Sequence, residues 1–68
     1  MTFTTKQPVR ITDPSHPLCG NTGTIIMLVY AYTKWPSDLL YLQMTSGSLE
    51  GQTYKVWANQ CSPVEVPA

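Results

Sequence analysis

The longest apolar stretch of the chain is Ile25 to Tyr32, eight consecutive hydrophobic residues that include two tyrosines. It is much shorter than the roughly 20 apolar residues of a membrane-spanning helix. Because it is rich in β-branched and aromatic residues, with no polar stripe at helical spacing, it predicts a strand over residues 23–32. Alternation from Ile25 leaves Ile26 and Tyr30 on a second face that is too apolar for water. The strand therefore bends so that both faces are covered, as in a small barrel, or a partner covers one of them.

Shorter alternating segments surround this run and predict an all-β fold. Strands are expected at Pro8–Ile11, residues 23–32, Leu39–Met44, Gln52–Trp57 and Pro63–Val66, with one 3-10 turn at Ala58–Cys61. Five short strands with a helical turn before the last are typical of an SH3-like small barrel, which removes exposed sheet edges. Residues 8–68 are assigned to this barrel and residues 1–7 to a flexible N-terminal arm whose apolar anchor is Phe3. The predicted core consists of Val9, Ile11, Ile25, Met27, Val29, Leu40, Leu42, Val56 and Val64.

The charge of the chain restricts its partners. Four basic residues balance four acidic ones, and only 12% of the 68 residues are charged, about half the usual share. Wide nucleic-acid contact is disfavoured, because it depends on clustered cations that displace counterions. So weakly charged a protein is expected to work within a complex. No secretion signal or spanning segment is evident, so a cytoplasmic location without membrane insertion is expected.

The nucleophilic and metal-binding side chains form no catalytic pattern. His16, Cys19 and Cys61 are fewer than the four Cys or His ligands of a structural zinc site. The two cysteines fall in regions that are often neighbours in SH3-like barrels, which allows a disulfide, but a cytoplasmic setting favours free thiols. A small redox or hydrolytic enzyme would need a reactive Cys19. We therefore expect a non-enzyme with neither cofactor nor metal, in which His16 is an ordinary loop residue.

Two stretches of the sequence resemble known β-barrel families. Val9-Arg10-Ile11, Asp13-Pro14, Gly20 and Gly23-Thr24-Ile25 resemble the opening of a KOW-type SH3-like barrel, and residues 61–66 are similar to its closing strand. The span from Val9 to Ile25 also resembles the start of the photosystem I reaction-centre subunit IV family. That resemblance implies an SH3-like accessory subunit of an electron-transport complex. Some members of that family dock ferredoxin through basic residues. Here the loop between the third and fourth predicted strands departs from the family and basic residues are sparse, so the resemblance leaves that docking role open.

The aromatic residues give the candidate site. More of them are present than so small a core can bury: Tyr30, Tyr32, Trp35, Tyr41, Tyr54 and Trp57. Trp and Tyr dominate the binding energy of protein interfaces, and loops on a rigid scaffold commonly carry function. The predicted partner-binding surface is centred on Trp35 and comprises Tyr32, Lys34, Trp35, Tyr41 and Trp57.

Several interpretations of these aromatics stay open. Both tryptophans can instead cap the ends of the barrel. A KOW-like barrel that binds RNA or DNA would contact it through Arg10, Lys34 and Lys55 together with the aromatics. Self-assembly into a homo-oligomer would use the apolar outer face of the long strand. The first interpretation remains a binding module or accessory subunit that docks on a protein partner or larger complex.

Overall fold

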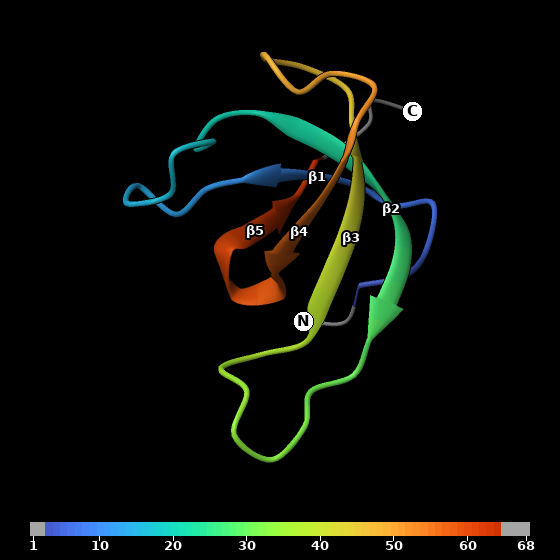
Figure 1. The fold of residues 1–68 in the computed structure, drawn as a ribbon, viewed down its shortest axis with the longest axis vertical. Coiled ribbons are helices and arrows are strands. Elements are labelled where there is room, and N and C mark those ends of the chain that lie inside the picture. The colour runs from blue at the N-terminus through green and yellow to red at the C-terminus, as the bar shows by residue number, and fades with distance from the viewer. Residues whose placement is uncertain (1–2, 65–68) are drawn as a thin grey trace.

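The computed structural model describes residues 3–64 and shows an all-β architecture (Figure 1). Its elements are β1 (Pro8–Ile11), β2 (Thr22–Val29), β3 (Leu39–Met44), β4 (Thr53–Trp57), the 3-10 turn η1 (Ala58–Gln60) and β5 (Cys61–Pro63). They form one five-stranded antiparallel sheet in the order β4-β3-β2-β1-β5. The all-β fold, the five strands and the 3-10 turn before the last strand are confirmed. Within residues 3–64, β4 and β5 are not paired with one another, so closure into a barrel stays a prediction.

The core lies on the inner face of this curled sheet. Buried as predicted are Val9, Ile11, Ile25, Leu40, Leu42 and Val56. They alternate along β1, β3 and β4 with outward-facing residues, as strands with one covered face require. Phe3, Met44 and Cys61 are also buried, although the sequence analysis did not place them in the core.

A bulge in β2 overturns the predicted register of that strand. Ile25 pairs with Leu42 and Met27 with Tyr41, so the intervening Ile26 has no partner of its own. Such an extra residue bends a strand and reverses its alternation. Beyond the bulge Leu28 packs against the core, whereas Met27 is 54% exposed and Val29 is only half-buried. The prediction of Met27 and Val29 as core residues was therefore wrong.

The last strand also differs from its prediction. It runs from Cys61 to Pro63 instead of Pro63–Val66, because Ile11 pairs with Cys61 and Val9 with Pro63. Val64, expected in the core, is half-buried and follows the strand. Val66 lies outside the described residues. Elsewhere β2 ends at Val29, short of the predicted end at residue 32.

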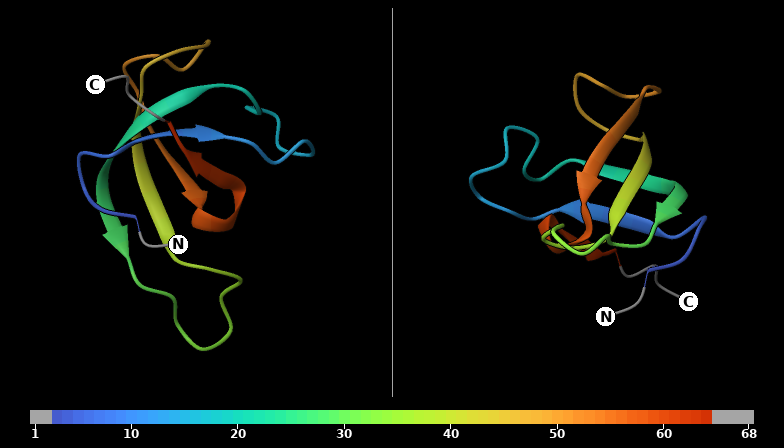
Figure 2. Two further views of the ribbon diagram at one scale, coloured as in Figure 1. Left: turned by 180° about the vertical axis from the view of Figure 1, so that it is seen from behind. Right: turned by 60° about the horizontal axis from the view of Figure 1, so that its bottom comes forward.

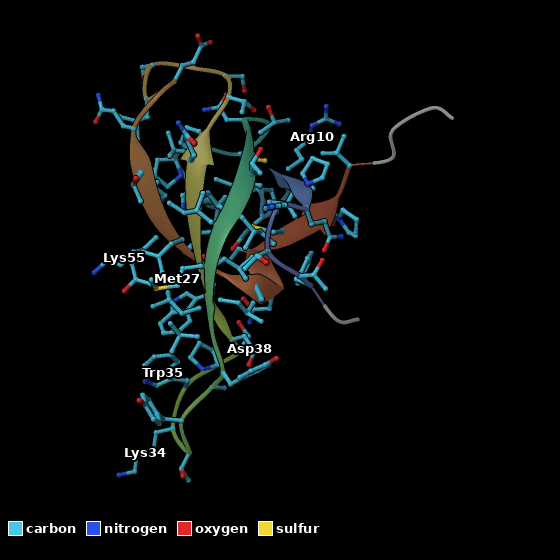
Figure 3. All side chains as sticks on the ribbon, turned by 90° about the vertical axis from the view of Figure 1, so that its right-hand side faces the viewer. Arg10, Met27, Lys34, Trp35, Asp38 and Lys55 are labelled. Carbon is cyan, nitrogen blue, oxygen red and sulfur yellow. The ribbon has the colours of Figure 1, made fainter. Side chains whose placement is uncertain are left out.

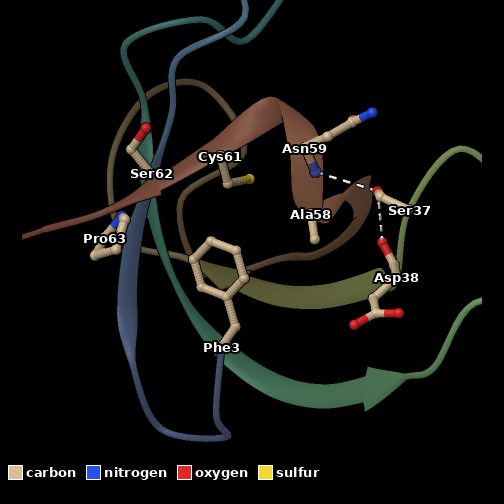
Figure 4. A pocket seen from close by; sticks show the side chains of 8 residues that line it. All are labelled: Phe3, Ser37, Asp38, Ala58, Asn59, Cys61, Ser62 and Pro63. Carbon is tan, nitrogen blue, oxygen red and sulfur yellow. Dashed lines mark hydrogen bonds between the residues drawn. The ribbon is translucent and has the colours of Figure 1, made fainter. Parts of the chain in front are cut away.

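The segment before β1 supplies one side chain to the core. The amide of Lys6 donates to the carbonyl of Ile25 at 2.7 Å, and the amide of Ile25 donates to the carbonyl of Gln7 at 3.0 Å. These bonds extend the pairing beside β2 past the start of β1, where the chain turns back (Figure 2). Phe3 then lies next to Cys61, in a pocket lined largely by η1 and β5 near the C-terminal end of the described chain (Figure 4).

Gly23 allows β2 and β3 to pack closely. A Cβ atom at this position would lie 3.1 Å from the carbonyl oxygen of Gln43 and 3.1 Å from the Cβ of Leu42. Such distances are shorter than ordinary van der Waals contacts, so a larger residue would push the two strands apart.

The buried position of Leu42 leads to a test of the register. Leu42 is 0% exposed at the centre of β3, so Leu42→Ala should lower the free energy of unfolding by about 2–5 kcal/mol. Urea denaturation followed by tryptophan fluorescence measures this loss. Gln43→Ala, on the exposed face of the same strand, should change the stability by less than about 0.5 kcal/mol. Equal stability of the Leu42→Ala variant and the unaltered chain would show that the register is wrong.

Candidate functional site

The loop between β2 and β3 is held in one shape by its own hydrogen bonds. The amide of Trp35 donates to the carbonyl of Tyr32 at 3.0 Å, which closes a four-residue turn. At the base of the loop, the Oδ1 atom of Asp38 accepts the amide of Ala31 at 2.8 Å. Two residues that are close in sequence, Tyr32 and Trp35, are thereby placed at the two ends of one turn.

A second set of hydrogen bonds fixes the loop to η1. The amide of Ala58 donates to the carbonyl of Asp38 at 2.8 Å. The amide of Asn59 donates to the Ser37 hydroxyl at 3.1 Å, and that hydroxyl donates to the Asp38 carbonyl at 3.1 Å (Figure 4). Because η1 follows β4 directly, these contacts set the position of the loop relative to Trp57, the last residue of β4.

Three of the predicted site residues form an aromatic cluster, defined here as Tyr32, Trp35 and Trp57. The ring centroids of Tyr32 and Trp35 lie 4.8 Å apart at an interplanar angle of 83°. Those of Trp35 and Trp57 lie 5.3 Å apart at 70°. Both contacts have the edge-to-face geometry that aromatic pairs prefer. Tyr32 remains 68% exposed, while both tryptophans are half-buried, so the cluster is ordered and still open to solvent.

The cluster continues onto the outer face of the sheet. Met27, Tyr41 and Lys55 are paired in one row across β2, β3 and β4. Val29, Leu39 and Trp57 form the next row, so Trp57 joins the cluster to the strands. We call this whole surface the outer patch; it comprises the aromatic cluster with Met27, Lys34, Leu39, Tyr41 and Lys55. Tyr41, also a predicted site residue, joins the patch through the pairing of its strand with Met27 and Lys55.

The charged groups of the outer patch are both lysines. Lys34 and Lys55 are exposed on the same side of the molecule as Met27 and Trp35 (Figure 3). Asp38 turns away from this side and lines the pocket that contains Phe3. The patch therefore carries positive charge beside apolar and aromatic area.

Met27 and Lys55 lie in the patch although neither was among the predicted site residues. Met27 was assigned to the core because the bulge at Ile26 leaves no signal in the alternation. Lys55 was considered only as a contact for nucleic acid, although its alternation with Val56 does place it on the outward face of β4.

The loop between β1 and β2 holds its polar groups by local bonds. The Nδ1 atom of His16 accepts the amide of Leu18 at 3.0 Å, and the His16 ring packs edge-to-face on Tyr54 at 5.7 Å. Hydrogen bonds from the hydroxyl and amide of Ser15, then from the side chain of Gln60, lower the pKa of Asp13. Within residues 3–64, no three His, Cys, Asp or Glu side chains are grouped as metal ligands would be. This loop has the contacts of a structural element.

Comparison with known proteins assigns this chain to no family. No protein-family model matches the chain, and neither characterised proteins nor solved structures give a significant match. None of the helical structure within residues 3–64 is long and apolar enough to cross a membrane.

The two thiols occupy different environments. Both are unpaired; Cys19 is exposed in the first loop and Cys61 is buried at the start of β5. Desolvation raises the pKa of the Cys61 thiol to about 11. The neutral thiol thus favours the folded state below the ordinary thiol pKa, and this contribution is lost as the pH rises toward the folded value.

These environments predict different reactivities of the two thiols. Near neutral pH, a chromogenic disulfide reagent should react rapidly with Cys19 alone, because the thiolate is the reactive form and Cys61 is protonated and covered. Addition of denaturant should expose the second thiol. The Cys19→Ser variant should show no rapid phase. Rapid reaction of both thiols in the native chain would contradict the burial of Cys61.

Proposed function

We propose that this chain is a non-enzymatic binding module, or accessory subunit, that docks on a protein partner through the outer patch. The observation that carries the proposal is the aromatic cluster, which is ordered by the loop and left accessible to solvent. Trp and Tyr contribute most to protein interfaces when a partner desolvates them. An SH3-like barrel is the scaffold we infer, since a five-stranded antiparallel sheet with a 3-10 turn before its last strand fits that fold.

The order of the loop supports this function energetically. Association costs about 0.5–1.5 kcal/mol for each flexible side chain that becomes fixed. Trp35 is already packed between Tyr32 and Trp57, and the loop beneath it is bonded to η1. A partner therefore loses little of its binding energy in ordering this surface.

Binding of RNA or DNA by the same patch is the competing function. Exposed aromatics with Lys34 and Lys55 resemble the stacking surfaces of proteins that bind single strands. Stacking needs open ring faces, however, and each edge-to-face contact covers one face of one ring, which leaves the cluster fewer open faces than three separate rings would have. Two lysines also release few counterions. Both features favour a protein partner.

The test is site-specific crosslinking followed by affinity measurement. A photoreactive amino acid in place of Lys34, beside Trp35, is expected to crosslink to a protein in cells that produce the chain. With that protein purified, Trp35→Ala should weaken binding by about 2 kcal/mol or more, roughly thirtyfold.

The matched control is Tyr30→Ala, which removes another exposed aromatic that is not part of the outer patch and lines a pocket with Thr4, Ile26 and, at the margin of the patch, Met27. It should leave the affinity unchanged. Trp35→Ala that binds normally but unfolds at much lower temperature would make Trp35 a barrel cap and refute the proposal. Crosslinking to RNA or DNA, with an affinity that falls steeply with salt, would establish the competing function.

A further inference from the structure

The pairing of β3 with β4 determines which backbone groups of β4 point away from the sheet. In an antiparallel pair, hydrogen-bonded residue pairs alternate with pairs that make no such bonds. The amide of Ala58 donates to Asp38 at one end of the ladder, and the amide of Met44 donates to Gln52 at the other. Counting inward from either end, Tyr54 and Val56 bond to β3. The backbone N–H and C=O groups of Thr53, Lys55 and Trp57 therefore point away from β3, in the plane of the sheet and beyond its edge.

Hydrogen bonds at Trp57 agree with this assignment. Its amide donates to the Oε1 atom of Gln60 at 3.2 Å, on the side away from β3. β4 is an edge strand of the sheet. Within residues 3–64, the backbone groups of Thr53 and Lys55 that point away from β3 have no hydrogen-bond partner. Unpaired groups of this kind are a template for another strand.

A groove of about 460 Å³ runs along this unpaired edge. It is lined by His16, Leu39, Tyr54, Lys55, Val56, Trp57 and Gln60. The loop between β1 and β2, which carries His16, lies on the side of β4 that is away from β3 (Figure 2). The groove thus combines backbone donors and acceptors with aromatic and aliphatic walls, as in sites that bind extended peptides by strand addition.

Charge indicates the chemistry of the segment that fits there. Among the described residues, Lys55 is the one Lys, Arg, Asp or Glu that lines the groove, and its side chain is exposed on the outer face. The carboxylate of Asp13, in the same loop as His16, is already bonded to Ser15 and Gln60. A residue directly opposite Lys55 on an added strand would share its face, where opposite charges attract and like charges repel. Two antiparallel copies of β4 paired about Lys55 would oppose two lysines, which disfavours a second copy of the chain.

We propose that an extended segment of the partner adds to the sheet as a strand along β4, with a carboxylate opposite Lys55 and apolar residues on either side. The flanking apolar side chains point toward Tyr54 and His16, because neighbours along a strand alternate in direction. The inference rests on the proposed function, since the groove shares Trp57 with the outer patch. It adds the mode of binding and the chemistry of the bound segment.

The probe is a synthetic peptide of alternating valine and threonine with one central glutamate, titrated into the isotope-labelled chain and followed by NMR. Hydrogen exchange at the amides of Thr53 and Lys55 should slow on binding, while that of Ile26 to Val29 stays unchanged. Replacing the glutamate by lysine should weaken binding about two- to thirtyfold, the range expected when an attractive cross-strand pair becomes repulsive.

Two variants make the test specific. Lys55→Glu should reverse the preference, so that the lysine peptide binds more tightly. Thr53→Pro removes one outward N–H without changing a charge, as edge strands tolerate, and should weaken both peptides. Unchanged exchange at Lys55, or equal affinities of both peptides for both charge forms, would overturn the proposal. The peptide experiments do not involve Trp35, so the two proposals can fail separately. If the peptide pairs with β4 but Trp35→Ala leaves the affinity for the protein partner unchanged, the edge site is supported and the outer patch is refuted as the docking surface.

Discussion

The unpaired residue Ile26 in β2 is the constraint on which the outer surface of this protein depends. A flat strand that is apolar on both faces would leave one whole apolar face in water if the sheet is covered on one side only. The bulge divides it into two parts of opposite alternation, so that Ile25 and Leu28 both reach the core. The same shift turns Met27 outward beside Tyr41 and Lys55, where it extends the apolar area of the outer patch.

The sequence predicts the regular strands well because their periodicity is local. Val9 and Ile11 in β1, and Leu40 and Leu42 in β3, alternate with polar or less buried neighbours, and their faces follow directly. The uniformly apolar β2 contains no such contrast, so a one-residue shift at Ile26 was invisible. The last strand was misplaced because Cys61 is buried through its pairing with Ile11, a contact between distant parts of the chain.

In the candidate site, too, contacts between sequence neighbours were predictable, whereas contacts that depend on strand pairing were not. Tyr32 and Trp35 are close in sequence and belong to one turn, so their proximity was predictable. The contact of Trp35 with Trp57 depends on the pairing of Leu39 with Trp57 and on the bonds between the loop and η1, which composition cannot reveal. The unpaired edge at Lys55 could not be predicted from the sequence either, because it depends on which residues of β4 form hydrogen bonds with β3.

The burial of Phe3 has a consequence for how the chain acquires its structure. Phe3 shares its pocket with Ala58, Cys61 and Pro63, so one wall of the core comes from the first described residues and the opposite wall from nearly the last. Folds dominated by contacts of such sequence separation fold slowly, because the chain loses loop entropy before the contacts can compensate. During synthesis, the core remains incomplete until β5 has left the ribosome, because Ile11 of β1 pairs with Cys61 and the pocket around Phe3 is lined by Cys61 and Pro63.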